Sequence, residues 1–382
     1  AGAMSSDLPD PAWTSTVVLG DGDTALIRPI HPDDAPALAA FHERQSAESR
    51  YLRYFSPKPR LDTKLLERFT NVDMLDRAAF VVELHGEFVG WGSYERLPQR
   101  PDAEVAFQVD DGQQGKGIAT LLLEHLAAVA TGNGISHFTA QTLGENRGML
   151  AVFAKAGWPV QRTFDSGVVD LEFPLDETAE YVGSVERREQ RADSRAVARI
   201  LLPSSIAVIG ASDVPGSIGA ALWRHVAADA TRATYPVNPR HPTVGGQPAF
   251  AAVTDIADEV GLAVIAVPAA ALADVVDQCI AKRVRGAIVV SEPEPGTDLR
   301  ALIAHARRNG LRIIGPASMG VASPLPGVAL QASIVNAATA PGSVAVSMQS
   351  GILGASLLRL AAQLELGLSW FVSLGDKLDV SA

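Results

Sequence analysis

Residues 103–131 constrain the fold of this chain more than any other stretch of its sequence. Apolar and polar residues alternate from Ala103 to Asp110, which is the period of a strand with one buried face. From Ile118 onward apolar residues recur at helical spacing, and the loop between the two patterns contains Gly115 and Gly117. At such a junction free backbone N–H groups and the positive end of the helix dipole face one point. The segment therefore predicts a site for a phosphate-bearing anion.

Two common phosphate loops do not fit this segment. A Walker loop needs Gly-Lys-Ser/Thr, whereas Lys116 is followed by Gly117. The dinucleotide fingerprint needs glycine at the position of Thr120. These mismatches exclude both a nucleoside triphosphate loop and a dinucleotide loop.

The pattern that fits is Gln114-x-x-Gly117-x-Ala119, which resembles the acyl-CoA pyrophosphate loop of the GCN5-related N-acetyltransferases. The resemblance implies that acetyl-CoA is the co-substrate. It also implies cofactor contacts at the strand end, the loop, the first helical turn and a later asparagine. These candidates are Val109, Gln114, Gly115, Lys116, Gly117, Ile118, Ala119, Thr120 and Asn146.

The elements predicted within residues 16–175 follow the order of the acetyltransferase α+β fold. Asn146 begins a predicted helix, and Gly157-Trp158 follows that helix. Together they resemble the second conserved segment of the family. There the asparagine is implied to bind the pantetheine arm or to help separate the two central strands. Strands are predicted at 24–29, 79–84, 88–95, 103–109, 136–141, 160–164 and 168–173, and helices at about 34–43, 47–55, 118–131 and 146–156.

Acyl transfer to an amine requires a group that removes a proton from the ammonium form, whose ordinary pKa is about 10.4. Glu104 is the candidate base, because the resemblance places a glutamate on this strand, on the face opposite Val105 and Phe107. An exposed strand glutamate without a catalytic role is the alternative. The backbone N–H near Val109 is expected to support the thioester oxygen. Many relatives carry a tyrosine where this chain has Phe153, so water, another group or unassisted departure must serve the leaving thiolate.

Composition excludes several classes of protein. A net charge of −11 without a basic run argues against nucleic acid as a partner. Cys279 is the single cysteine, so no intramolecular disulfide and no cysteine-rich metal site can form. No metal is expected in this protein. The apolar neighbours of Cys279 indicate a packed thiol. No uninterrupted apolar stretch reaches about 18 residues. We therefore expect a cytoplasmic protein that does not enter a membrane.

The segment 176–202 is predicted to link two modules. Charges of both signs interleave along it, and Val197, Ile200 and Leu201 form a weak apolar stripe before Pro203. A helix that enters the second module and a disordered tether are both compatible with this pattern.

Residues 203–325 are predicted to form a Rossmann-like domain with a parallel sheet. Strand-like runs at 206–209, 235–237, 262–267, 287–290 and 312–314 alternate with amphipathic helices. The loop 210–219 follows the first strand, and the second strand ends in Asn238-Pro239-Arg240 without a carboxylate for a ribose. Arg240 instead suits a ribose phosphate such as that of coenzyme A. The candidate ligand residues are Ser212, Gly216, Ser217, Ile218, Gly219, Asn238 and Arg240.

Several ordered motifs of the second half resemble the nucleotide-diphosphate-forming acyl-CoA synthetases. They include the loop 210–219, the run 235–246 and the segment 341–351, and they imply that 326–382 is a partial, flavodoxin-like second subdomain. Ala317 stands where that family has asparagine, and neither a phosphohistidine segment nor an ATP-binding half is recognisable. This half is therefore expected to bind or sense an acyl-CoA, or to make structural contacts, rather than to form thioesters.

The combination of the two modules resembles the bacterial protein lysine acetyltransferases, in an actinobacterial-like domain order. The resemblance implies a protein acceptor, a lysine of a metabolic enzyme such as an AMP-forming acyl-CoA synthetase. Direct transfer in a ternary complex is expected, since the first module has no cysteine to carry an acyl group. A small-molecule amine N-acetyltransferase with a CoA-sensing domain and a non-catalytic CoA-binding regulator are the alternatives.

Overall fold

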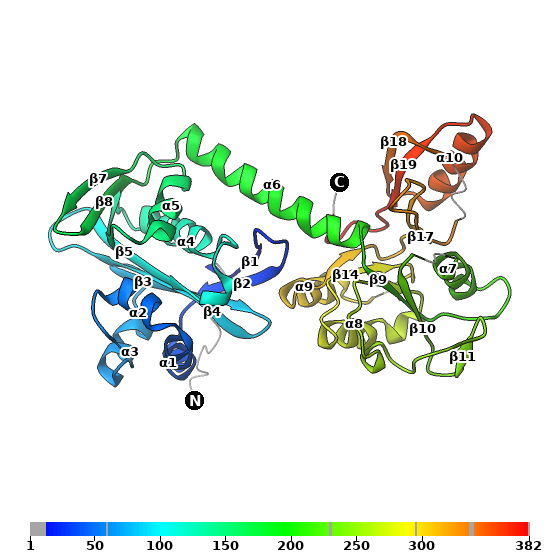
Figure 1. Ribbon diagram of the computed structural model, residues 1–382, viewed down its shortest axis with the longest axis horizontal. Helices are drawn as coiled ribbons and strands as arrows, with labels where there is room; N and C mark the ends of the chain where they lie inside the picture. Colours follow the sequence, from blue (N-terminus) through cyan, green and yellow to red (C-terminus); the bar gives the residue numbers. More distant parts are fainter. Residues whose placement is uncertain (1–12, 59, 229–230, 295, 336–339, 381–382) are drawn as a thin grey trace. The chain divides into compact units, whose positions relative to one another are not determined.

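The computed structural model describes residues 13–58, 60–228, 231–294, 296–335 and 340–380 (Figure 1). The chain divides into two compact units, Ala1–Asp193 and Ser194–Ala382. Each unit has its own sheets and its own apolar core, so each is described by itself.

The first unit is built on one eight-stranded sheet in the order β1-β2-β3-β4-β5-β6-β8-β7. Neighbouring strands pair antiparallel except β5 and β6, which are parallel. The strands are β1 (Ser15–Val18), β2 (Thr24–Pro29), β3 (Arg77–Leu84), β4 (Glu87–Arg96), β5 (Asp102–Val109), β6 (His137–Leu143), β7 (Gln161–Asp165) and β8 (Val168–Pro174). The helices are η2 (Pro32–Asp34), α1 (Ala35–Arg44), α2 (Ala47–Tyr54), α3 (Thr63–Thr70), η3 (Asp111–Gln113), α4 (Ile118–Gly132) and α5 (Arg147–Lys155).

Apolar side chains cover both faces of this sheet. On one face, Phe107 of β5 packs in a core with Leu122 and Leu126 of α4 and Phe153 of α5. On the other face, Phe41 of α1 and Trp91 of β4 belong to a second cluster. The predicted alternation is confirmed from Ala103 to Phe107, because Val105 and Phe107 are buried while Glu104 is exposed. It fails at the strand end, where Gln108 is buried and Val109 is only half-buried.

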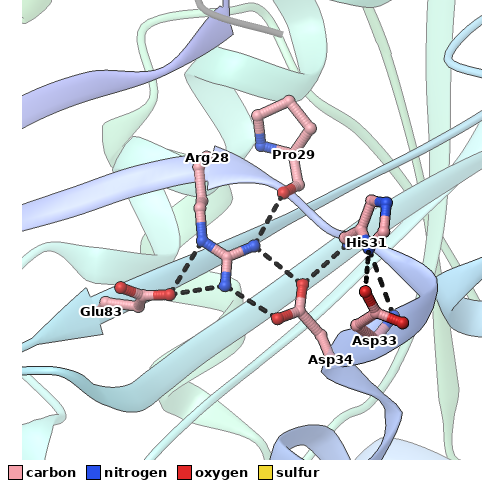
Figure 2. A network of polar contacts seen from close by, with 6 residues as sticks. All are labelled: Arg28, Pro29, His31, Asp33, Asp34 and Glu83. Carbon is pink, nitrogen blue, oxygen red and sulfur yellow. Dashed lines mark hydrogen bonds and ion pairs between the residues drawn. The ribbon is translucent and has the colours of Figure 1, made fainter. Parts of the chain in front are cut away.

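An ion-pair network joins β2, β3 and η2 at the edge of the second face (Figure 2). The Arg28 guanidinium donates to both carboxylate oxygens of Asp34, at 2.7 and 2.8 Å, and its Nε donates to Glu83 at 2.8 Å. Asp34 also accepts the backbone N–H of His31 at 2.7 Å. One half-buried arginine thus fixes the position at which α1 begins.

Residues 176–202 contain a helix, α6 (Ala179–Leu201), rather than a tether without regular structure. In the first unit, the Tyr181 ring stacks on Trp158 with 4.2 Å between centroids, and the Ser184 hydroxyl donates to the Ala156 carbonyl at 3.0 Å. In the second unit, Ile200 near the helix end is fully buried.

The second unit contains the predicted parallel sheet, in the order β10-β9-β13-β14-β15. A second sheet follows, in the order β17-β16-β19-β18. Its strand β16 lies before residue 326, the position at which the sequence predicts the last segment to begin. The strands are β9 (Ser205–Ile209), β10 (Ala233–Val237), β11 (Thr243–Val244), β12 (Gln247–Pro248), β13 (Leu262–Ile265), β14 (Gly286–Val289), β15 (Arg312–Ile314), β16 (Gly320–Ser323), β17 (Leu330–Ser333), β18 (Pro341–Met348) and β19 (Leu368–Ser373). The helices are α7 (Ile218–Ala227), η4 (Val253–Asp255), η5 (Ala269–Ala271), α8 (Leu272–Ala281), α9 (Leu299–Arg308) and α10 (Gly351–Gln363).

Candidate active site

A cavity of about 600 Å³ lies in the first unit, where β5 and β6 separate. Over their described residues the two strands pair only at Asp102–Glu104 and His137–Thr139. The cavity is lined from there on by the rest of β5, the end of β6, the segment 113–120 apart from Lys116, and residues of α2 and α5. The residues predicted from two distant segments of the sequence therefore converge on one site.

The loop at 114–117 has the backbone that the sequence predicts. Gly115 and Gly117 have φ angles of +78° and +88°, and an added Cβ would meet no atom within 4 Å at either, so they serve the left-handed backbone. Gly117 is the N-cap of α4, and no side chain caps that helix. The N–H groups of Ile118, Ala119 and Thr120, which line the cavity, therefore face an anion-binding position.

A close contact between α4 and β4 fixes the place of this helix start. A Cβ on Gly90 of β4 would lie 2.7 Å from Cγ2 of Ile118, the first residue of α4. Ile118 itself is 1% exposed. Its predicted contribution to the cofactor site is therefore limited to its backbone, while its side chain anchors the helix.

Two side chains of the loop are already engaged. The Lys116 ammonium pairs with Asp21 at 2.7 Å, and Lys116 is not among the residues that line the cavity. Its carbonyl accepts the N–H of Gly20 at 2.7 Å, so Lys116 fastens the β1–β2 turn to the loop. Gln114 does line the cavity, and its amide donates to Asp111 at 3.3 Å.

The backbone of β5 offers free groups to the cavity. The Asp110 N–H donates to the Val89 carbonyl at 2.9 Å, and hydrogen-bonded and non-hydrogen-bonded pairs alternate along an antiparallel ladder. The N–H groups of Phe107 and Val109 consequently point away from β4, toward the side from which β6 has separated. The amide of Val109 is thus available at the predicted position.

Asn146 and Phe153 lie on the α5 side of the cavity. The Asn146 carboxamide oxygen accepts the N–H of Met149 at 3.0 Å, so this residue caps α5. Phe153 is 2% exposed, and its ring packs 5.6 Å from Phe107 and 5.4 Å from Phe173. The structure thus places an apolar ring at the position where the family resemblance implies a tyrosine hydroxyl.

Glu104 occupies the point at which the strands separate. It pairs with Glu95 of β4 on one side and with Thr139 of β6 on the other. Its side chain is exposed, and it precedes Val105, the first β5 residue that lines the cavity. The Arg68 guanidinium binds Glu95 at 2.6 Å and so offsets the neighbouring carboxylate.

Two further residues of the cavity were not predicted as site residues. Gln108 is 6% exposed, on the same face of β5 as Glu104. Arg53 of α2 lies 5.5 Å from the Trp91 ring centroid, and burial lowers its pKa although the charges of Tyr54 and Glu104 act in the opposite direction. The sequence around Arg53 fits an acceptor groove or a solvated helix face, and the fold places Arg53 at the cavity.

The glycine-containing loop of the second unit is shaped by packing. A Cβ on Gly219 would lie 2.0 Å from the Gly210 carbonyl oxygen, whereas one on Gly216 would meet nothing within 4 Å. Ser217 caps α7 by accepting the N–H of Ala220 at 3.2 Å. The Ser212 hydroxyl accepts the Val214 N–H at 3.0 Å. Ile218, the first residue of α7, is 49% exposed.

Asn238 joins the end of β10 to this loop. Its amide nitrogen donates to the Ala211 carbonyl at 2.7 Å, and its oxygen accepts the N–H groups of Arg240 and His241 at 2.8 and 3.2 Å. The Arg240 side chain is exposed. Of the predicted pair, Asn238 therefore holds the loop, and Arg240 is the group free to approach a ligand.

In the described ranges, no cluster of three or more His, Cys, Asp or Glu side chains could hold a metal ion. Within the same ranges, none of the helices is both long and apolar enough to cross a membrane.

Comparisons with known proteins agree with the two domains. The acetyltransferase (GNAT) domain family matches residues 25–158, and the CoA binding domain family matches residues 204–324. An acetyltransferase of Pseudomonas aeruginosa is 30% identical over 151 residues, which cover 38% of this chain and 81% of that protein. Fold and site thus define a GNAT-fold acetyltransferase joined to a CoA-binding domain. The chain belongs to the GNAT acetyltransferases.

The second half is similar to the ADP-forming acetate–CoA ligase of Methanocaldococcus jannaschii, with 33% identity over 185 residues. The match covers 47% of this chain and 26% of that ligase, so the chain spans about a quarter of this relative's length. Among solved structures, the GNAT domain of S. lividans PAT is 45% identical, with a TM-score of 0.41 and coverage of 43% of this chain and 98% of that domain.

Proposed function

We propose that the chain transfers an acetyl group from acetyl-CoA to the ε-amine of a lysine in a protein, with Glu104 as general base. The observation that carries the proposal is the position of Glu104 at the separation of β5 and β6, next to a cavity that ends at the uncapped start of α4. The free amides of β5, the two loop glycines and the open helix start fit an acyl-CoA.

Each of these groups has a distinct role in the proposed reaction. Bound acetyl-CoA supplies the thioester carbonyl. Glu104, directly or through one water, accepts a proton from the lysine ammonium, and the freed nitrogen attacks that carbonyl carbon. The Val109 N–H stabilises the negative charge on the carbonyl oxygen. The nitrogen, now bonded to the carbonyl carbon, releases its second proton to water, and the carbon–sulfur bond then breaks. Phe153 cannot donate a proton, so the sulfur leaves as thiolate or is protonated by water.

The exposure of Glu104 favours a macromolecular acceptor. A carboxylate on the open face of the sheet can meet a lysine that projects from a protein surface, whereas a small amine would need an enclosed pocket. The ligase-like second unit supports a metabolic role, and we propose an AMP-forming acyl-CoA synthetase as acceptor. In this proposal the second unit binds a CoA-type ligand through the loop 210–219 and Arg240, and it regulates transfer.

Labelled acetyl-CoA tests the proposal. The chain is incubated either with an AMP-forming acyl-CoA synthetase or with a panel of free amines, and Glu104→Gln serves as the inactive control. We expect label in synthetase lysines and none in the amines. Label in the amines alone would contradict the protein acceptor, and no transfer to either would point to a non-catalytic CoA-binding regulator.

A further inference from the structure

Asp111 holds together two segments that are far apart in the sequence. It opens η3, directly after β5, and its carboxylate accepts the Ser46 N–H at 2.8 Å and the Gln114 amide at 3.3 Å. The Ser49 hydroxyl makes a further short hydrogen bond to it. Ser46 and Ser49 belong to the start of α2, while Gln114 belongs to the cofactor loop. One carboxylate therefore connects α2 to the loop.

α2 depends on such polar contacts for its position. It has eight residues, and a helix of this length is marginal by itself. No residue of it is fully buried; Arg53 and Tyr54 are half-buried against Trp91 and His42, while its N-terminal end is held by the polar contacts to Asp111. Its side chains nevertheless form one wall of the cavity, through Glu48, Ser49, Leu52 and Arg53. Arg53 of α2 lies over Trp91, on the same face of the sheet as Glu104, so α2 forms the acceptor side of the site, the side from which a lysine would reach Glu104. A small displacement of α2 would change the shape of this side.

The Asp111 carboxylate is well suited to this contact. Partial burial acts to raise its pKa, but the hydrogen bonds from Ser49 and Ser46 outweigh burial and lower the pKa below its ordinary value. The ionised carboxylate makes charge-assisted hydrogen bonds, and it faces the N-terminus of α2, where the helix dipole favours negative charge.

We propose that Asp111 is a positioning residue that fixes α2 on the cofactor loop and thereby sets the acceptor wall relative to the bound acyl-CoA. This inference rests on the proposed function. Asp111 acts through Ser49 and Gln114 and contacts no substrate. The cofactor site and the acceptor site thus share one mechanical link.

Steady-state kinetics of Asp111→Ala test the link in the full chain. We expect the KM for the acceptor protein to rise about tenfold, a factor that corresponds to the net free energy of one charged hydrogen bond. The KM for acetyl-CoA should change much less. Asp111→Asn keeps one accepting oxygen and should restore part of the loss. Asp62→Ala is the matched control, since Asp62 caps α3 by accepting the Leu65 N–H at 2.8 Å and α3 does not line the cavity. An equal effect of Asp62→Ala would overturn the inference.

A double-mutant cycle with Ser49→Ala isolates the contact. The double variant should be little worse than the poorer single variant, because each substitution removes the same hydrogen bond. Fully additive losses would show that Asp111 does not act through Ser49.

Limited proteolysis separates this inference from the proposed function. Trypsin can cleave α2 at Arg50 and Arg53, and we expect faster cleavage there in Asp111→Ala than in the wild type or Asp62→Ala. The measurement needs no acetyl transfer, so it still reports on the link if the wild type proves inactive. Unchanged cleavage would overturn the link.

Discussion

Glu104 on β5 lies directly opposite Thr139 on β6, and among the described residues of both strands this is the last pair before they separate. Strand pairing up to this point gives the carboxylate a rigid base, and the separation beyond it opens the cavity. A side chain on a paired segment is held more precisely than one on a loop. The geometry therefore supports a base whose position does not depend on the acceptor.

Glu104→Gln should lower kcat/KM for the acceptor by about 10²–10⁴, the usual contribution of general-base catalysis. Acetyl-CoA affinity should be unchanged, because the cofactor groups lie on the loop and the α4 start. Glu87→Gln is the control, because Glu87 is an exposed glutamate at the start of β4, whereas Glu104 pairs with Glu95 near the end of that strand. A loss of less than threefold would assign Glu104 to the solvated surface.

Asp34→Asn should destabilise the first unit at neutral pH by about 1–2 kcal/mol, since it weakens the bidentate bond to Arg28, which keeps its ion pair with Glu83. Burial acts to raise the pKa of Asp34, but its bonds to Arg28 and His31 outweigh burial, and the pKa is lowered from 3.8. A carboxyl with a lowered folded-state pKa stabilises the fold above its unfolded pKa and stops doing so as the pH falls through the folded value.

The difference between wild type and Asp34→Asn should therefore be constant from pH 7 to about pH 5 and shrink below about pH 4. Urea unfolding at a series of pH values measures it. Asp33→Asn is the control, because the Asp33 side chain is 88% exposed and pairs only with His31. A difference that persists undiminished at the lowest pH would argue against the ion pair.

Gly219→Ala should destabilise the second unit by about 3 kcal/mol, since its Cβ would overlap the Gly210 carbonyl and push α7 away from β9. Gly216→Ala, in the same loop, should cost only about 1–2 kcal/mol for the left-handed backbone, because its Cβ meets no atom. Urea unfolding followed by circular dichroism compares the two. Equal costs would contradict the close helix–strand contact.

Cys279 should not react with Ellman's reagent in the folded chain. Burial raises the pKa of its thiol to about 12, so almost no thiolate exists at pH 8 and little surface is open to attack. Guanidinium chloride should release one equivalent of thiol at once. Rapid reaction of the native protein would show that α8 opens readily.

Local signals made much of the first unit predictable. The predicted strands 79–84 and 88–95 leave only a short turn between them, and His85 and Gly86 form it in the structure, both with positive φ; Gly115 and Gly117 likewise indicated the loop backbone. The capping role of Asn146 also follows from its place before an apolar helix. In each case the residues that determine the structure are adjacent in the sequence.

Features set by distant contacts could not be predicted in this way. α3 is only eight residues long and is stabilised by packing, with Phe69 4.6 Å from the Trp91 ring. Lys116 resembled a phosphate ligand, but its partner is Asp21, nearly a hundred residues earlier in the chain. The link from Asp111 to α2 likewise joins residues more than sixty positions apart.

The single buried thiol has a practical consequence. Since Cys279 is the only cysteine and is shielded within the core of the second unit, a cysteine placed at an exposed position would be labelled alone, without removal of any native residue. A fluorophore at Glu48 of α2 would then respond to movement of that wall against an otherwise silent background. One substitution therefore suffices to place a single label on the acceptor side of the site.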